Sequence, residues 1–148
     1  MKIVIQRVQH ASVTIDEKVH GKIAQGYMIL VGITQDDNEQ IVEKLAKKCV
    51  ELRIFEDDMG KMNRSLLDIQ GQVLSISQLT LYADCRKGRR PGFEQAARPD
   101  HAMPLYEHFN NAIRSHGVVV KTGIFGADMQ VELCNDGPVT IVLDSKEM

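Results

Sequence analysis

Tyr27-Met28-Ile29-Leu30-Val31-Gly32-Ile33 is an uninterrupted apolar segment with polar residues close on both sides. A run of this length is typical of a buried strand, because a buried helix needs a longer stretch. No window of the chain approaches the 18 apolar residues of a membrane-spanning helix, so we predict none. The segment 27–33 is therefore predicted as a buried strand.

The residues around this strand predict a β-rich first third followed by a helix. Apolar residues favour strands over 3–8, 11–15 and 19–23, with a turn at 16–18. A helix is predicted to start at Asp36-Asp37-Asn38 and to end near Leu52. These three residues are candidate N-caps, and Gln40 follows Asp37 at capping-box spacing. One face of this helix carries apolar residues at helical spacing: Ile41, Val42, Leu45, Cys49 and Leu52.

The second half of the chain alternates strands with one more helix. A helix is predicted over about 100–116, with Ala102, Leu105, Tyr106, Phe109 and Ile113 as its apolar stripe. The other predictions are a short strand at 53–55, a polar segment at 56–68, a strand over 72–77 that continues through 77–82, a long loop at 83–98, strands over 118–122 and 129–134, a turn at 135–138 and a last strand over 139–143. We expect one mixed α/β domain over 1–148 with a large or curled sheet.

Composition excludes several classes of protein. The chain has 148 residues, 18 Lys plus Arg, 20 Asp plus Glu, and a net charge of −2. These values fit a globular protein rather than a disordered one, and no global basic field is available to coat nucleic acid. Any contact with nucleic acid would have to come from a local basic patch.

Cysteine and histidine spacing gives no metal site. Cys49, Cys85 and Cys134 are far apart and lack zinc-ligand spacing, so we expect reduced thiols in a cytoplasmic protein. The apolar run at the chain start is too short for a signal peptide. His101 and His108 lie about 10 Å apart along a helix and cannot share one metal ion. No P-loop or GxSxG motif occurs, and we predict neither a metal nor a cofactor.

Two short segments carry a resemblance to a known family. Ser77-Gln78-Leu79-Thr80-Leu81 and Asn135-Asp136-Gly137-Pro138-Val139-Thr140 together resemble the paired signature of the D-aminoacyl-tRNA deacylases. The resemblance extends over essentially the whole chain. Two positions depart from the common pattern of that family, which has Phe at position 79 and Ser at position 92, where this chain has Leu79 and Gly92. The first departure affects the expected wall of the pocket, and neither removes a group assigned to chemistry.

This resemblance implies an activity and an assembly. It implies hydrolysis of the ester that joins a D-amino acid to the terminal adenosine of tRNA. It also implies a homodimer of barrel-like subunits, each with two main helices packed outside the sheet. The Gly137-Pro138 pair of one subunit is expected to enter the pocket of the other, with its peptide bond cis. Membranes and DNA are not expected partners.

The first signature segment supplies the expected catalytic residues Ser77, Gln78 and Thr80. In a regular strand Gln78 and Thr80 share one face and Ser77 lies on the other, so a common pocket requires the strand to end or bulge here. Thr80 as a nucleophile would need a base, and no His or carboxylate is near in sequence. We therefore favour oxyanion and substrate positioning by these residues and neighbouring N–H groups, with water attacking the ester. A strand end whose hydroxyls bind backbone is the structural alternative.

The second signature segment, with Arg7 and Phe93, is expected to select the substrate. A rigid Gly137-Pro138 corner could hold the substrate's α-amino group with its carbonyls and exclude an L side chain. Glycine has no side chain, so exclusion predicts hydrolysis of glycyl-tRNA as well. Arg7 is expected to brace this corner, unless it is a surface arginine. Phe93 is expected to wall the pocket, although simple packing is an equal alternative.

The loop at 83–98 contains the densest basic run. Asp84 to Arg98 has five basic and two acidic residues, a local charge of +3. Arg86, Lys87, Arg89 and Arg90 are candidates for binding phosphates of the tRNA acceptor end, against the alternative of a solvated loop. Two other functions stay open: a non-catalytic tRNA or aminoacyl-binding module of the same fold, and a hydrolase of small D-amino-acid esters that needs no RNA.

Overall fold

The fold is built around one long strand at the centre of a six-stranded sheet. In the computed structural model, which describes residues 1–148, β1 (Lys2–Ile15) pairs with three other strands. The sheet order is β2 (Lys18–Ile23), β1, β3 (Gly26–Gly32), β6 (Gln72–Ser77) and β7 (Val120–Thr122). The remaining strand, β8 (Gln130–Asp144), runs antiparallel to β1 along nearly its whole length.

The sheet curls until its two ends meet. His20 in β2 places its Nδ1 2.9 Å from the carbonyl oxygen of Thr122 in β7. A Cβ added to Gly21 would lie 3.2 Å from that same oxygen, so the two strands are in close contact. The result is the nearly closed, barrel-like sheet that the family resemblance implied.

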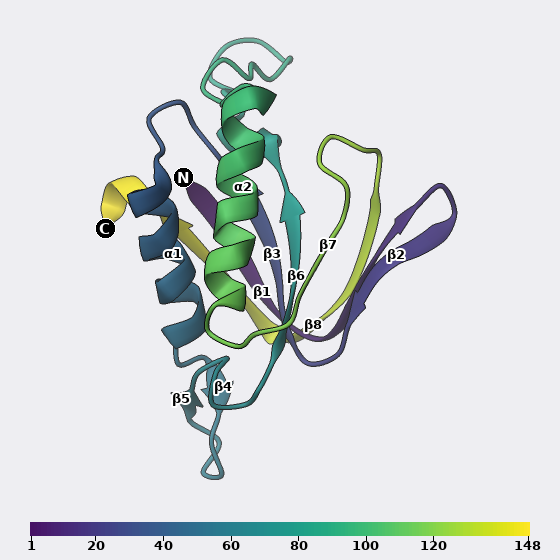
Figure 1. Cartoon of the computed structure of the whole chain (residues 1–148), viewed down its shortest axis with the longest axis vertical. Helices are drawn as coiled ribbons and strands as arrows, with labels where there is room; N and C mark the ends of the chain where they lie inside the picture. The colour runs from purple at the N-terminus through teal and green to yellow at the C-terminus, as the bar shows by residue number, and fades with distance from the viewer.

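Two helices, α1 (Glu39–Glu51) and α2 (Pro99–Arg114), lie side by side against the sheet (Figure 1). The predicted stripe of α2 is confirmed, because all five of its residues are buried. On α1, Ile41 and Leu52 are only half-buried, and Ala46 and Val50 join the core instead. A second apolar cluster, which includes Val8, Met28 and Leu74, fills the sheet away from the helices. Neither helix is long and apolar enough to cross a bilayer.

The pairing between β1 and β8 corrects several predicted boundaries. The predicted strands at 3–8 and 11–15 form one strand, and those at 129–134 and 139–143 form another, with no separating turn. Each is continuous because the other provides a pairing edge along its length. The segment predicted as polar, 56–68, contains most of a small hairpin in which β4 (Phe55–Glu56) pairs with β5 (Met62–Arg64).

The predicted continuation of the strand through residues 79–82 is wrong. β6 ends at Ser77, and the chain turns at Gln78 into the 3₁₀ helix η1 (Leu79–Tyr82). The N–H of Gln78 still donates to the carbonyl of Val31, at 2.7 Å, but β3 ends one residue after Val31. With no neighbouring strand left to pair with, the backbone bonds to itself, and the N–H of Leu81 donates to the carbonyl of Gln78 at 3.2 Å.

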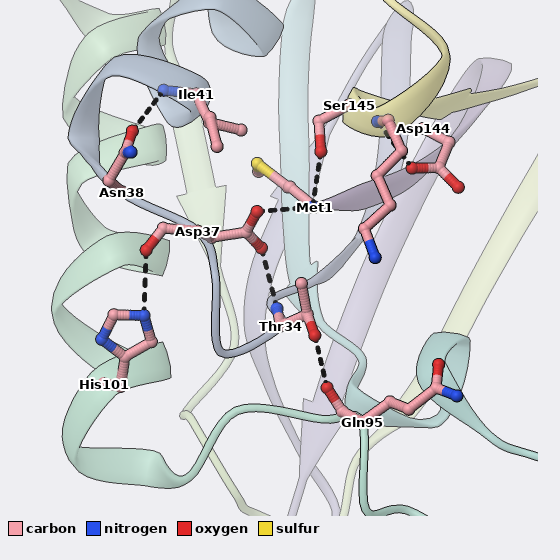
Figure 2. A network of polar contacts seen from close by, with 10 residues as sticks. Met1, Thr34, Asp37, Asn38, Ile41, Gln95, His101, Asp144 and Ser145 are labelled. Carbon is pink, nitrogen blue, oxygen red and sulfur yellow. Dashed lines mark hydrogen bonds and ion pairs between the residues drawn. The ribbon is translucent and has the colours of Figure 1, made fainter.

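Asp37 is not the helix cap that its position predicted (Figure 2). Asn38 caps α1, and its side-chain oxygen accepts a hydrogen bond of 3.0 Å from the N–H of Ile41. Asp37 is only 4% exposed. Its carboxylate accepts hydrogen bonds from the α-ammonium of Met1, at 2.6 Å, and from the N–H of Thr34, at 2.8 Å. The chain start therefore provides a buried counter-ion that sequence spacing does not reveal.

Candidate functional site

The two signature segments occupy different parts of the sheet. Ser77 pairs with Val31, which pairs with Ile3, whereas the Gly137-Pro138 corner lies opposite Arg7, four residues further along β1. Four residues of strand span about 13 Å, and three strand spacings span about 14 Å. Measured along the sheet, the segments are therefore about 20 Å apart. The strand register of one chain keeps the two segments apart along the sheet.

The first segment forms an exposed turn at the end of β6. The side-chain amide of Gln78 donates a hydrogen bond to the hydroxyl oxygen of Thr80. Thr80 is exposed, and it has no hydrogen bond to any histidine or carboxylate. Leu79 is 52% exposed. The turn thus gathers the amide of Gln78 and the hydroxyl of Thr80, but it contains no base for a nucleophile.

The start of η1 adds backbone donors to this turn. The first hydrogen bond of the helix comes from the N–H of Leu81, so the N–H groups of Leu79 and Thr80 precede any helical acceptor. Such unpaired donors can stabilise a developing negative charge on an ester oxygen. Because β6 ends at Ser77, the strand geometry that separated Ser77 from Gln78 and Thr80 no longer applies.

The second segment is a bulge in β8. Gln6 pairs with Thr140 and Val8 with Asn135, so residues 136–139 face Arg7 alone. The Gly137-Pro138 peptide bond is cis, as expected, and both residues are exposed. Asn135, which we had not singled out, closes the bulge: its Oδ1 accepts from the N–H of Val139 at 2.7 Å. The preference of Asn for turns was the available signal.

Arg7 is a buried residue beneath this bulge rather than a surface arginine. It is 5% exposed. Its Nε donates to the carbonyl of Asp136 at 2.9 Å, and its Nη1 donates to the carbonyl of Ile54 at 2.6 Å. The nearest carboxylate contact, to Oδ2 of Asp136, is 3.9 Å long. Arg7 therefore ties the bulge to the segment that follows α1 mainly through backbone carbonyls.

The basic loop at 83–98 is closed by backbone hydrogen bonds, and only one of its arginines is held in an ion pair within it. The backbone groups of Asp84 and Gly92 exchange hydrogen bonds of 2.7 and 2.9 Å. Arg86 binds both carboxylate oxygens of Asp84, at 2.9 and 2.8 Å, and this contact lowers the pKa of Asp84 to about 2. Lys87, Arg89 and Arg90 are exposed and form no ion pair. These three charges, more than Arg86, are available to a phosphate.

The remaining predicted groups lie as follows. Phe93 is 41% exposed in the same loop and does not belong to the core. His101 bonds to the carbonyl of Asp37 at 3.0 Å, and His108 bonds to Glu43 at 2.8 Å. No group of three His, Cys, Asp or Glu side chains has the geometry to hold a metal ion.

Nearly the full length of the chain is similar to proteins of one known family. A family model described as D-Tyr-tRNA(Tyr) deacylase matches residues 4–144. A D-aminoacyl-tRNA deacylase of Thermus aquaticus is 59% identical over 147 residues, covering 99% of this chain and 97% of that protein. One of Bacillus pumilus is also 59% identical and is covered completely.

Two solved structures share the fold. A c-Myc DNA unwinding element binding protein superposes with a TM-score of 0.91 at 39% identity, over 97% of this chain and 98% of its own. A probable eukaryotic D-amino acid tRNA deacylase superposes with a TM-score of 0.85 at 17% identity, over 96% of this chain and 97% of its own, and this likeness concerns the fold alone.

Proposed function

Since this chain belongs to the D-Tyr-tRNA(Tyr) deacylase family, we propose that it hydrolyses D-aminoacyl-tRNA to a free D-amino acid and tRNA, and rejects L-aminoacyl-tRNA at the Gly137-Pro138 corner. Membership makes it a hydrolase of aminoacyl-tRNA that serves translation quality control. The observation that carries the activity is the 59% identity over 147 residues to a deacylase.

The complete site is formed by two copies of the chain. The Ser77–Thr80 turn and the Gly137-Pro138 corner are about 20 Å apart along the sheet of one chain, which is more than one aminoacyl group spans. Leu79 and Thr80 of the turn and both residues of the corner are exposed, so each segment can meet its counterpart on a second copy. A two-fold symmetric dimer would create two identical sites, each with the turn of one subunit and the corner of the other.

Hydrolysis proceeds by attack of water on the ester carbonyl. Gln78 and the N–H groups of Leu79 and Thr80 stabilise the oxyanion, and Ser77 and Thr80 position the substrate. The 2′-hydroxyl of the terminal ribose is available to assist the water. The corner holds the α-amino group with its carbonyls and leaves no room for an L side chain.

Thr80→Val should lower kcat by about tenfold to 100-fold, as expected for the loss of a positioning group. The reason is that the hydroxyl accepts from Gln78 and has no base to take its proton. Single-turnover deacylation of D-tyrosyl-tRNA, with acid quenching, measures the effect. A loss above about 10⁴-fold, with an acyl-enzyme trapped on the unsubstituted protein, would establish Thr80 as the nucleophile.

Glycyl-tRNA should be a substrate as well, because chiral selection by exclusion acts only on an L side chain. We expect deacylation of glycyl-tRNA within about tenfold of the rate with D-alanyl-tRNA, and L-alanyl-tRNA slower by at least about 100-fold. The three substrates can share one tRNA body so that only the amino acid varies. Inertness toward glycyl-tRNA beside activity on D-alanyl-tRNA would contradict exclusion.

Lys87, Arg89 and Arg90 contact phosphates of the acceptor end. Arg89→Gln with Arg90→Gln should raise KM about tenfold at low salt and flatten the dependence of log KM on log salt by about 1 to 2 units, because two phosphate contacts are lost. Lys18→Gln with Lys22→Gln removes the same charge from exposed positions of the β1–β2 hairpin. Equal salt slopes in both double variants would argue for a solvated loop.

One assay separates the remaining alternatives. Matched D- and L-tyrosyl-tRNA are compared with a free D-tyrosine ester. The proposed function predicts hydrolysis of D-tyrosyl-tRNA alone, a binding module predicts no hydrolysis, and a small-ester hydrolase predicts turnover of the free ester.

A further inference from the structure

Asp37 is buried and has no role in the chemistry described above, yet its side chain and backbone together contact Met1, Thr34 and His101 (Figure 2). It accepts from the α-ammonium of Met1 and from the N–H of Thr34. The backbone carbonyl of Asp37 also bonds to His101 of α2. A side chain and a terminal amine that are both almost fully buried form an ion pair little screened by water.

Thr34 extends this contact to the basic loop. Its hydroxyl donates a 2.5 Å hydrogen bond to the carbonyl of Gln95, and the neighbouring Gln35 amide donates to the carbonyl of Glu94 at 2.8 Å. Glu94 and Gln95 directly follow Phe93 and belong to the same loop as the exposed basic residues. Asp37 fixes the position of Thr34 through its hydrogen bond to the Thr34 N–H. Thr34 in turn fixes the end of the loop at Gln95.

A second contact, between Lys2 and Tyr82, links the start of β1 to η1, which follows Ser77 and Gln78. The ammonium of Lys2 lies 4.8 Å from the ring centroid of Tyr82, the last residue of η1. The hydroxyl of Ser145 accepts another hydrogen bond from the Met1 ammonium, at 2.8 Å. Both the loop and the turn are thus braced by groups that converge on the first two residues.

We propose that Asp37, paired with the Met1 ammonium, is a positioning group for the tRNA-binding loop, which it holds through Thr34. This inference rests on the proposed role of the loop in binding tRNA.

The test combines loop order with kinetics. Asp37→Asn keeps the size of the side chain but removes its charge, and Thr34→Val removes only the hydroxyl that holds Gln95. Both should speed hydrogen exchange of the amides of 84–97 and raise KM for D-tyrosyl-tRNA about tenfold, with kcat within about threefold. The double variant should be no worse than the worse single variant, because the two groups act in series. Asp36→Asn, an exposed neighbour, is the matched control.

Unchanged exchange in Thr34→Val or additive effects in the double variant would each overturn the proposal. Should Asp37→Asn not fold, Thr34→Val still tests the contact with Gln95. Faster exchange with unchanged KM would support the positioning while contradicting the loop's role in tRNA binding, and the preference for D- over L-tyrosyl-tRNA should stay constant throughout.

Discussion

Replacing Gly137 with alanine should lower kcat/KM for D-tyrosyl-tRNA by at least about 100-fold, because the corner can no longer keep its position. Gly137 has a φ of +137°, a region that residues with a side chain rarely adopt. An added Cβ would lie 2.8 Å from Cγ2 of Val139 and 3.1 Å from Nη2 of Arg7. The bulge must shift to relieve these contacts, and the proposed carbonyl contacts with the α-amino group shift with it.

Gly60→Ala is the control for Gly137→Ala, because it introduces the same kind of backbone strain without a steric contact. Gly60 also has a positive φ, of +74°, but an added Cβ would find no atom within 4 Å. It lies between β4 and β5, outside both signature segments. We expect this variant to keep full activity. An active Gly137→Ala variant would contradict the proposed role of the corner, and an equal loss in both variants would point to a general loss of folding.

Gly137→Ala also allows a direct test of the two-chain site. A dimer that combines one Gly137→Ala subunit with one Gln78→Ala subunit has one site with both halves intact. After random subunit exchange, about a quarter of the unsubstituted activity should return from two variants that are inactive alone. A site contained within one chain predicts no recovery.

Arg7→Met should reduce both stability and activity. Methionine fills similar space but leaves the carbonyls of Ile54 and Asp136 without their donors, at a cost of about 2–4 kcal/mol in the free energy of unfolding. Urea denaturation measures this loss. We expect kcat/KM for D-tyrosyl-tRNA to fall by about 100-fold at a temperature where the variant is folded, because the bulge is no longer tied down.

Arg53→Met is the matched control for that substitution. Arg53 also donates to a backbone carbonyl, that of Asn63 at 3.0 Å, but it is exposed, so water can replace the lost contact. We expect a change below about 1 kcal/mol and full activity. Arg7→Lys is not expected to rescue the function, since one ammonium group cannot reproduce the forked geometry that reaches two separate carbonyls. Full activity of Arg7→Met would remove the brace from the mechanism.

The helices could be predicted from sequence because their pattern is local. The stripe of α2 recurs every three or four residues, and each of its predicted members is buried. The ends of strands were harder to predict, because a strand continues only while a neighbour offers a pairing edge. Residues 79–82 have the apolar character of a strand, but β3 ends beside them and they form a turn instead.

Sequence by itself determined the family, the two signature segments and the residue types that could bind an ester, an amine and a phosphate. Only the tertiary structure decided their arrangement. Arg7 donates a hydrogen bond to the carbonyl of Asp136, 129 positions away in the chain. The ammonium of Met1, directly before β1, donates to the carboxylate of Asp37. Such contacts depend on strand register and on a bulge between distant segments, which no local spacing encodes. For the same reason, only the folded chain shows that its two signature segments lie on different strands, well apart along the sheet.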